Sequence, residues 1–135
     1  MATTADDHLT ELSDQACWDL LRSTQVGRIA WTTADGPVVL PVNHVVDGRS
    51  IRIRTRGGSA LVQKVDLERV AFEVDRIDEA THRGWSVLAR GRAAVRYGDD
   101  AGGSRPNPWP SGPRSAVVTI AVDAITGRRL GPTPG

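Results

Sequence analysis

Apolar and polar residues alternate with a period of two along most of the chain, and this pattern is typical of half-buried β-strands. The alternation, together with Gly, Pro and Asp turn residues between the segments, predicts six strands. They cover residues 26–33, 38–46, 50–56, 70–74, 85–97 and 114–122. In the segment from Ser50 to Arg56, every second residue is arginine, so one side faces a core and the other is cationic. Pro41 is expected to break or bulge the second strand.

The first part of the chain has a helical period instead. A short helix is predicted to begin near Ser13, whose hydroxyl can cap it. Its apolar side carries Ala16, Cys17, Leu20 and Leu21. A second small helix is expected at residues 60–65. We expect residues 1–11 and 131–135 to be flexible tails, which leaves residues 12–130 as one domain.

Several hairpin-connected strands and few helices predict a mainly β fold, a small antiparallel barrel. A closed sheet buries its apolar positions without leaving exposed edges. A doubly wound nucleotide-binding fold is not expected, because the strands do not alternate with long helices. With 135 residues, the chain suits a single core.

Composition excludes several functional classes. The 17 basic and 16 acidic residues nearly balance, so nucleic-acid or membrane binding is not expected. No basic leader or long apolar run is present, and we expect a soluble cytoplasmic protein. The single cysteine, Cys17, and three histidines without ligand spacing predict no metal site. No serine lies in a G-x-S-x-G elbow, so a hydrolytic triad has no support.

The strongest candidate site lies where the cationic strand meets the second helix. A phosphate monoester is bound by positive charge, hydroxyl donors and free amides that converge, and this segment supplies all three. The residues are Arg54, Thr55, Gly58, Ser59 and Lys64. The alternative is a solvated cationic strand beside an ordinary helix cap, and composition alone does not decide between the two.

A second candidate is Pro41-Val42-Asn43. A proline inside a strand frees nearby backbone groups, which could hydrogen-bond the edge of a heterocycle. An edge strand or bulge without a ligand is the alternative. His44 follows directly, and we expect it to be a surface or packing residue and not a catalyst.

Taken in order, these residues resemble the pyridoxamine 5′-phosphate oxidase-like flavoproteins, in particular the small actinobacterial members. The resemblance covers about residues 12–130 and implies a six-stranded antiparallel split β-barrel with a short N-terminal helix and one or two small helices. The stretches that carry it are Leu12-Ser13, residues 26–30, Pro41-Val42-Asn43, Ile53-Arg54-Thr55, Gly58-Ser59, residues 70–75, residues 84–87, Arg90-Gly91, Pro108-Trp109 and residues 125–129.

The resemblance implies a homodimer with two FMN sites at the subunit interface, each built from both chains. It assigns Arg54, Thr55 and Ser59 to the flavin phosphate. The residues bordering the isoalloxazine ring would be Pro41, Val42 and Asn43. The residues approaching from the second subunit would be Trp85, Ser86, Trp109 and Arg128. Trp85 and Trp109 could instead be packing residues.

The implied activity is that of an FMN-dependent oxidoreductase, in which the flavin carries the redox chemistry. One position departs from the family pattern, since Ala60 stands where relatives commonly have lysine after the Gly-Ser pair. Lys64, one helical turn later, could compensate. Two alternatives stay open. One is an F420-dependent reductase that uses Arg52 and Arg56 for the longer acidic tail, and the other is a non-catalytic flavin- or haem-binding module.

Overall fold

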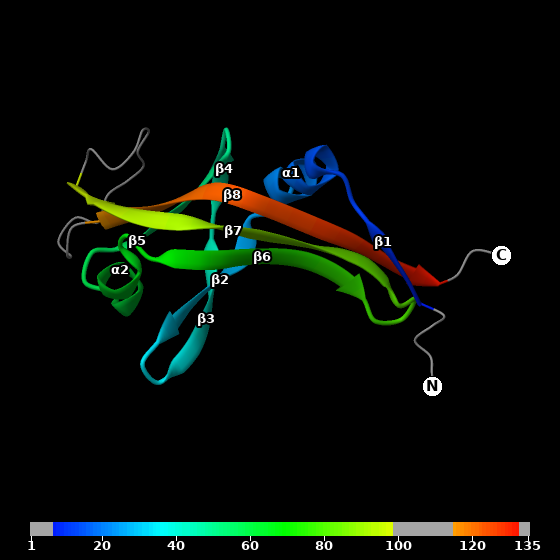
Figure 1. Cartoon of the computed structure of the whole chain (residues 1–135), viewed down its shortest axis with the longest axis horizontal. Coiled ribbons are helices and arrows are strands. Elements are labelled where there is room, and N and C mark those ends of the chain that lie inside the picture. The colour runs from blue at the N-terminus through cyan, green and yellow to red at the C-terminus, as the bar shows by residue number, and fades with distance from the viewer. Residues whose placement is uncertain (1–6, 99–114, 133–135) are drawn as a thin grey trace.

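The computed structural model describes residues 7–98 and 115–132. Its described part contains two helices and one eight-stranded antiparallel sheet (Figure 1). The helices are α1 (Asp14–Arg22) and α2 (Ala60–Val65). The strands are β1 (Asp7–Glu11), β2 (Val26–Thr33), β3 (Gly36–Asn43), β4 (Val45–Asp47), β5 (Ser50–Arg56), β6 (Arg69–Asp78), β7 (Arg83–Tyr97) and β8 (Ser115–Pro132).

The strands follow the order β3-β2-β6-β7-β8-β5-β4, with β1 also paired to β8. The mainly β prediction with few helices is confirmed. The six strands expected for a split β-barrel are not confirmed, because the described sheet has eight strands and its hydrogen-bonded order does not form a closed ring. Its two end strands, β3 and β4, are consecutive in the chain and are joined by His44. The two end strands are therefore linked through His44 in the chain and not by hydrogen bonds that would close the sheet.

The predicted second strand is divided at His44 and not at Pro41. Pro41 keeps its place in the ladder opposite Arg28, because β3 is an end strand and a residue without an N–H can face its open edge. His44 leaves the ladder, and its N–H donates to the carbonyl of Gln25 at 2.9 Å. Its side chain turns into the core, and β4 starts beyond it.

Residues 7–11, expected as part of a tail, form β1 and pair with residues 128–132 at the end of β8. Likewise β8 extends from Ser115 to Pro132, well past the strand predicted to end at Val122. The register places Glu11 opposite Arg128. Backbone ladders do not depend on apolar side chains, so a polar segment can join a sheet without an alternating pattern.

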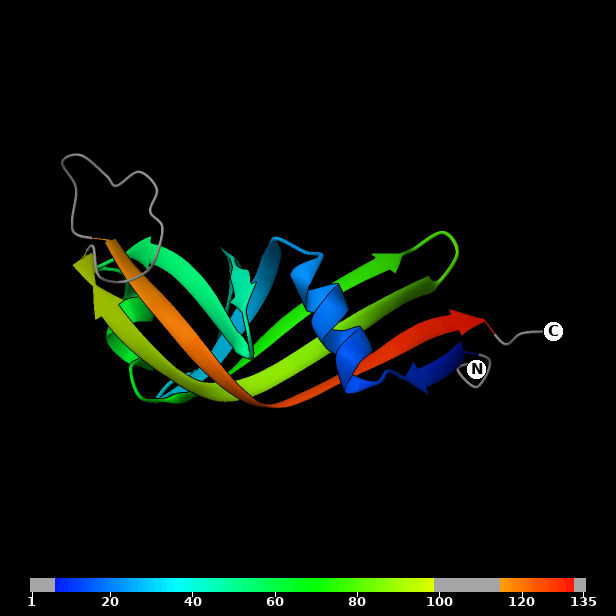
Figure 2. The ribbon, with the colours of Figure 1, turned by 90° about the horizontal axis from the view of Figure 1, so that it is seen from above.

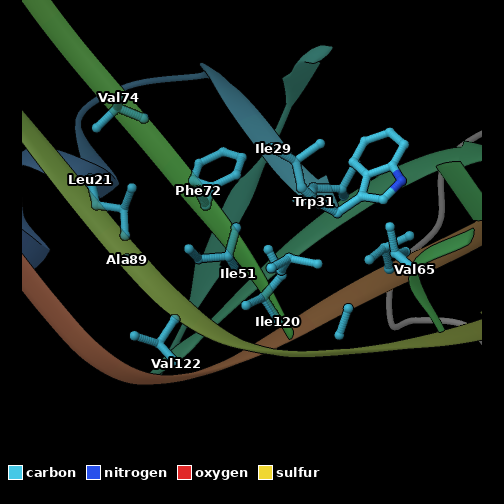
Figure 3. Close-up of a cluster of buried hydrophobic side chains, with 14 of the residues drawn as sticks. Leu21, Ile29, Trp31, Ile51, Val65, Phe72, Val74, Ala89, Ile120 and Val122 are labelled. Carbon is cyan, nitrogen blue, oxygen red and sulfur yellow. The ribbon is translucent and has the colours of Figure 1, made fainter. Parts of the chain in front are cut away.

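The core lies on the inner side of the curved sheet, and both helices pack against it, α2 through Leu61, Val62 and Val65 (Figures 2 and 3). The Ser13 hydroxyl accepts a hydrogen bond from the Ala16 N–H at 3.1 Å, which confirms the predicted cap. From α1, Cys17, Trp18 and Leu21 are buried. They meet inward residues of the sheet, which include Ile29, Ile51, Phe72, Val74, Ala89 and Ile120. We call the side of the sheet turned away from this core the outer face.

Candidate functional site

The predicted phosphate residues lie at the end of β5 and the start of α2. Arg54 is exposed on the outer face, whereas Thr55 is half-buried and points the other way. Ser59 caps α2, where its Oγ accepts a hydrogen bond from the Val62 N–H at 3.4 Å. The Ser59 hydroxyl hydrogen therefore stays available to a ligand. A Cβ placed on Gly58 would meet nothing within 4 Å, so the backbone there borders open space.

Two cationic side chains near this loop have no competing partner. Within the part of the chain that the structure describes, neither Arg54 nor Lys64 forms an ion pair or side-chain hydrogen bond. Helix α2 buries Leu61, Val62 and Val65, which leaves Lys64 on the exposed side together with Ala60. Lys64 and Ala60 therefore share the exposed side of α2, one helical turn apart.

The second predicted group lies on β3. Pro41 and Asn43 are exposed, and Val42 is partly buried against the core. The ladder with β2 places Pro41 opposite Arg28 and Asn43 opposite Val26. β3 also approaches β5 without forming a ladder with it. The structure therefore places the predicted ring residues on a strand beside the one that carries Arg54 and Thr55.

The third predicted group lies elsewhere in the protomer. Trp85 and Ser86 are at the start of β7, and Arg128 is directly opposite Ser86 on β8. This end of the molecule carries β1, and α2 is at the other end (Figure 1). Within one protomer, these residues are therefore far from the predicted phosphate-binding residues at the end of β5 and the start of α2. Trp85 is half-buried and packs against the core, as the packing alternative expects. Trp109 lies outside the described residues.

An ionic cluster on the outer face links the second and third groups. Arg28 Nη1 lies 2.9 Å from Glu73 Oε1 and 3.3 Å from Asp75 Oδ2. Arg28 is opposite Pro41, and Asp75 is opposite Ser86. Burial and the nearby Asp75 carboxylate raise the pKa of Glu73 to about 7, and these effects outweigh the lowering by Arg28. Our sequence reasoning missed this cluster, although the Glu-x-Asp spacing on one strand places both carboxylates on the same face.

His44 is a packing residue, as predicted. Its ring is only 5% exposed and meets Phe72 edge-on at a centroid distance of 4.9 Å. Nε2 lies 3.2 Å from the carbonyl oxygen of Leu21, a distance that suits an N–H donor on this nitrogen. Burial lowers the pKa of His44, so the ring is neutral near pH 7.

Among the residues that the structure describes, no three His, Cys, Asp or Glu side chains gather as ligands for a metal ion. Neither of the described helices is long and apolar enough to span a bilayer.

Comparison with known proteins gives consistent matches. A family model described as pyridoxamine 5′-phosphate oxidase matches residues 13–129. The uncharacterized protein Rv0080 of Mycobacterium tuberculosis is 34% identical over 131 residues, which are 90% of this chain and 86% of the relative.

Solved structures of similar proteins share the fold. An FAD binding protein from Mycobacterium smegmatis has 34% identity and a TM-score of 0.70, and the match covers 90% of this chain and 98% of that chain. A protein of unknown function from Corynebacterium diphtheriae has 28% identity and a TM-score of 0.71, over 95% and 99% of the two chains.

Proposed function

Because the chain belongs to the pyridoxamine 5′-phosphate oxidase family, we propose that it is a homodimeric, FMN-dependent oxidoreductase. The observation that carries this proposal is the set of unpaired hydrogen-bond donors, suited to a phosphate, at the junction of β5 and α2. It is supported by the M. smegmatis relative, which is an FAD binding protein and matches over nearly its whole length. FMN is the part of FAD that contains the ring, the ribityl chain and one phosphate.

The donor set at this junction is chemically suited to a phosphate monoester. Arg54 supplies a planar guanidinium, Ser59 a hydroxyl hydrogen and Lys64 an ammonium group. Within the described ranges, no carboxylate forms an ion pair with Arg54 or Lys64. The open space beside Gly58 lets a ligand approach the backbone closely. The residues present therefore fit the phosphate end of FMN.

The remaining residues would position and shield the ring. Bound FMN supplies the hydride or electron transfer. In our proposal, Pro41, Val42 and Asn43 would border the ring, with the exposed Pro41 and Asn43 on the side that carries Arg54. The partner's Trp85, the partner's Ser86 and the partner's Arg128 would cover the opposite side and exclude water. Trp109 would belong to this second group.

Direct titration of the purified protein tests the proposal. Flavin absorbance and fluorescence would be followed on adding FMN, FAD or F420 to separate samples of the full chain. We expect one FMN per chain and weaker binding of the other two. An absence of FMN binding at tens of micromolar would overturn the proposal.

A matched pair of variants tests the phosphate assignment. Arg54→Ala should weaken FMN binding by roughly 1.5 to 3 kcal/mol, the scale of a hydrogen bond to a charged group. Arg22→Ala is the control, because it removes the same charge from an exposed position on α1. Equal affinity of the two variants would contradict the role of Arg54.

F420 is the alternative that the same titration addresses. Its acidic tail would call on Arg52 and Arg56, but Arg52 is already held by Asp47, with Nη2 2.8 Å from Oδ2. The structure therefore offers less free basic surface for that tail than the sequence indicated. A protein that takes up F420 and not FMN would replace our proposal with this one.

A further inference from the structure

A pocket opens where two neighbouring strands separate. β2 pairs with β6 at three positions only, from Arg28 opposite Glu73 to Ala30 opposite Ala71. Beyond them β2 stays with β3, and the β2–β3 hairpin turns away from β6 (Figure 1). The space left between the strands is a pocket of about 270 Å³. None of the residues that we assign to FMN lines it.

The pocket combines apolar walls with a cationic rim. Its walls are formed by residues that are small or apolar, namely Ala30, Trp31, Pro37, Val70 and Ala71. Arg69 and Arg90 also line it. The edges of β2 and β6 that face the gap lack a ladder partner beyond Ala30 and Ala71, so backbone polar groups border it too.

The two arginines differ in what they can offer a ligand. Arg69 is held by Asp123 through two contacts, Nη1 to Oδ2 at 2.7 Å and Nη2 to Oδ1 at 3.0 Å. Arg90 forms no ion pair or side-chain hydrogen bond with the described residues. Its cross-strand neighbours are Ala71 and Ala124, which are too short to cover it. Arg90 is therefore a free cation beside an apolar slot.

We propose that this pocket binds a small organic carboxylate, whose anionic group pairs with Arg90 and whose apolar body lies between β2 and β6. A guanidinium matches a carboxylate through two parallel hydrogen bonds. A cavity of about 150 Å³ is enough for benzene, so the larger volume here accommodates an aromatic ring with a carboxylate. The charge of Arg69 is balanced by Asp123, so Arg90 is the cation of this pocket that would pair with the ligand's carboxylate.

Benzoate is a suitable probe, with benzamide as its neutral counterpart. Each would be titrated into the full-length protein without flavin, and binding would be followed by amide ¹H–¹⁵N NMR. We expect saturable shifts at residues 30–32 and 71 and at the indole N–H of Trp31 with benzoate, and much weaker ones with benzamide. Because no flavin is present, failure here and failure of the FMN proposal are distinguishable.

Variants decide whether the pocket and Arg90 are responsible. Arg90→Gln should weaken benzoate binding by about tenfold or more. Arg96→Gln, a change at an exposed arginine of the same strand outside the pocket, should leave it unchanged. Ala71→Leu should block the slot and abolish the shifts. The proposal is overturned if benzoate causes no saturable shift, if benzamide binds equally, or if Arg90→Gln has no effect.

Discussion

Single glycines decide how closely the strands approach one another. Gly91 lies at the bulge between β7 and β8, and a Cβ there would collide with the carbonyl oxygen of Ala121. Gly127 is similar, because its Cβ would lie 2.7 Å from Cys17 Sγ under α1. Glycine is therefore needed at both positions because a larger residue would not fit, and not because the backbone has a positive φ there. Gly58 has the opposite surroundings, with open space around it.

This contrast predicts different costs for the same substitution. Gly91→Ala should lower the free energy of unfolding by roughly 1 to 3 kcal/mol, the usual cost of overpacking against a backbone that cannot move freely. Gly58→Ala should change it by less than about 0.5 kcal/mol, as exposed substitutions usually do. Urea denaturation followed by circular dichroism measures both. Similar values for the two variants would show that β7 and β8 separate easily at the bulge.

Ala60 gives a prediction in the direction of stronger binding. It lies at the start of α2, on the same exposed side as Lys64. Ala60→Lys should raise the affinity for FMN by about tenfold, because a second ammonium group would reach the phosphate. Gln15→Lys, which adds the same charge on α1, is the control. If both variants bind FMN as the wild type does, the phosphate lies elsewhere.

At the scale of elements, the sequence predicts those strands whose one side faces the core. In β5 the alternation of isoleucine and arginine matches the observed burial of Ile51 and Ile53. The pattern fails where a strand lacks regular alternation of apolar and polar residues, as in β1 and in the second half of β8, where Ile125 is buried but arginines and small residues surround it. It also places the break in the second strand at Pro41, whereas burial of His44 moves the break to that residue.

The candidate site shows the same division between local and distant information. Arg54, Thr55, Gly58 and Ser59 follow one another in the chain, so a local pattern was enough to group them. The relation of Ser86 to Asp75 and Arg128 depends on the register of three strands. The pocket beside Arg90 depends on where β2 leaves β6. No local pattern contains either of these facts.

The ionic cluster across β2 and β6 predicts a pH dependence of stability. The pKa of Glu73 is about 7 in the folded protein, above its ordinary value of 4.5. Between these two values the folded chain retains a proton that the unfolded chain has lost. The free energy of unfolding contributed by Glu73 is therefore largest at low pH and falls as pH rises through this window.

Urea denaturation at several pH values between 5 and 8 measures this contribution. We expect the free energy of unfolding of wild type, relative to Glu73→Gln, to decrease steadily over this range. Asp75→Asn should make the decrease smaller, because it removes the neighbouring carboxylate that helps raise the pKa of Glu73. A difference that does not vary with pH would contradict the shifted pKa.

At the scale of the whole molecule, the separation of the predicted residue groups indicates how the chain would assemble. Pro41 on β3 and Ser86 on β7 flank the two strands that carry the ionic cluster on the outer face, because Pro41 is opposite Arg28 on β2 and Ser86 is opposite Asp75 on β6. A twofold axis through this face would bring the start of β7 in one subunit toward β3 in the other. Val39 is 58% exposed on the same face and would be covered by such contact. This arrangement would complete each flavin site with residues of both chains.

Mixing two variants that each bind FMN weakly tests this arrangement directly. Arg54→Ala removes one of the residues proposed to bind the phosphate, and Arg128→Ala removes one of the residues proposed to come from the second chain. Each homodimer should therefore bind FMN weakly. In a mixed dimer, one site would carry both substitutions and the other would carry none. With free subunit exchange at equal amounts, half of the dimers are mixed, and about a quarter of all sites should regain wild-type affinity. Equilibrium titration of the mixture with FMN measures this fraction. If the site were built within a single chain, the mixture would bind as the average of the two variants, with no high-affinity fraction.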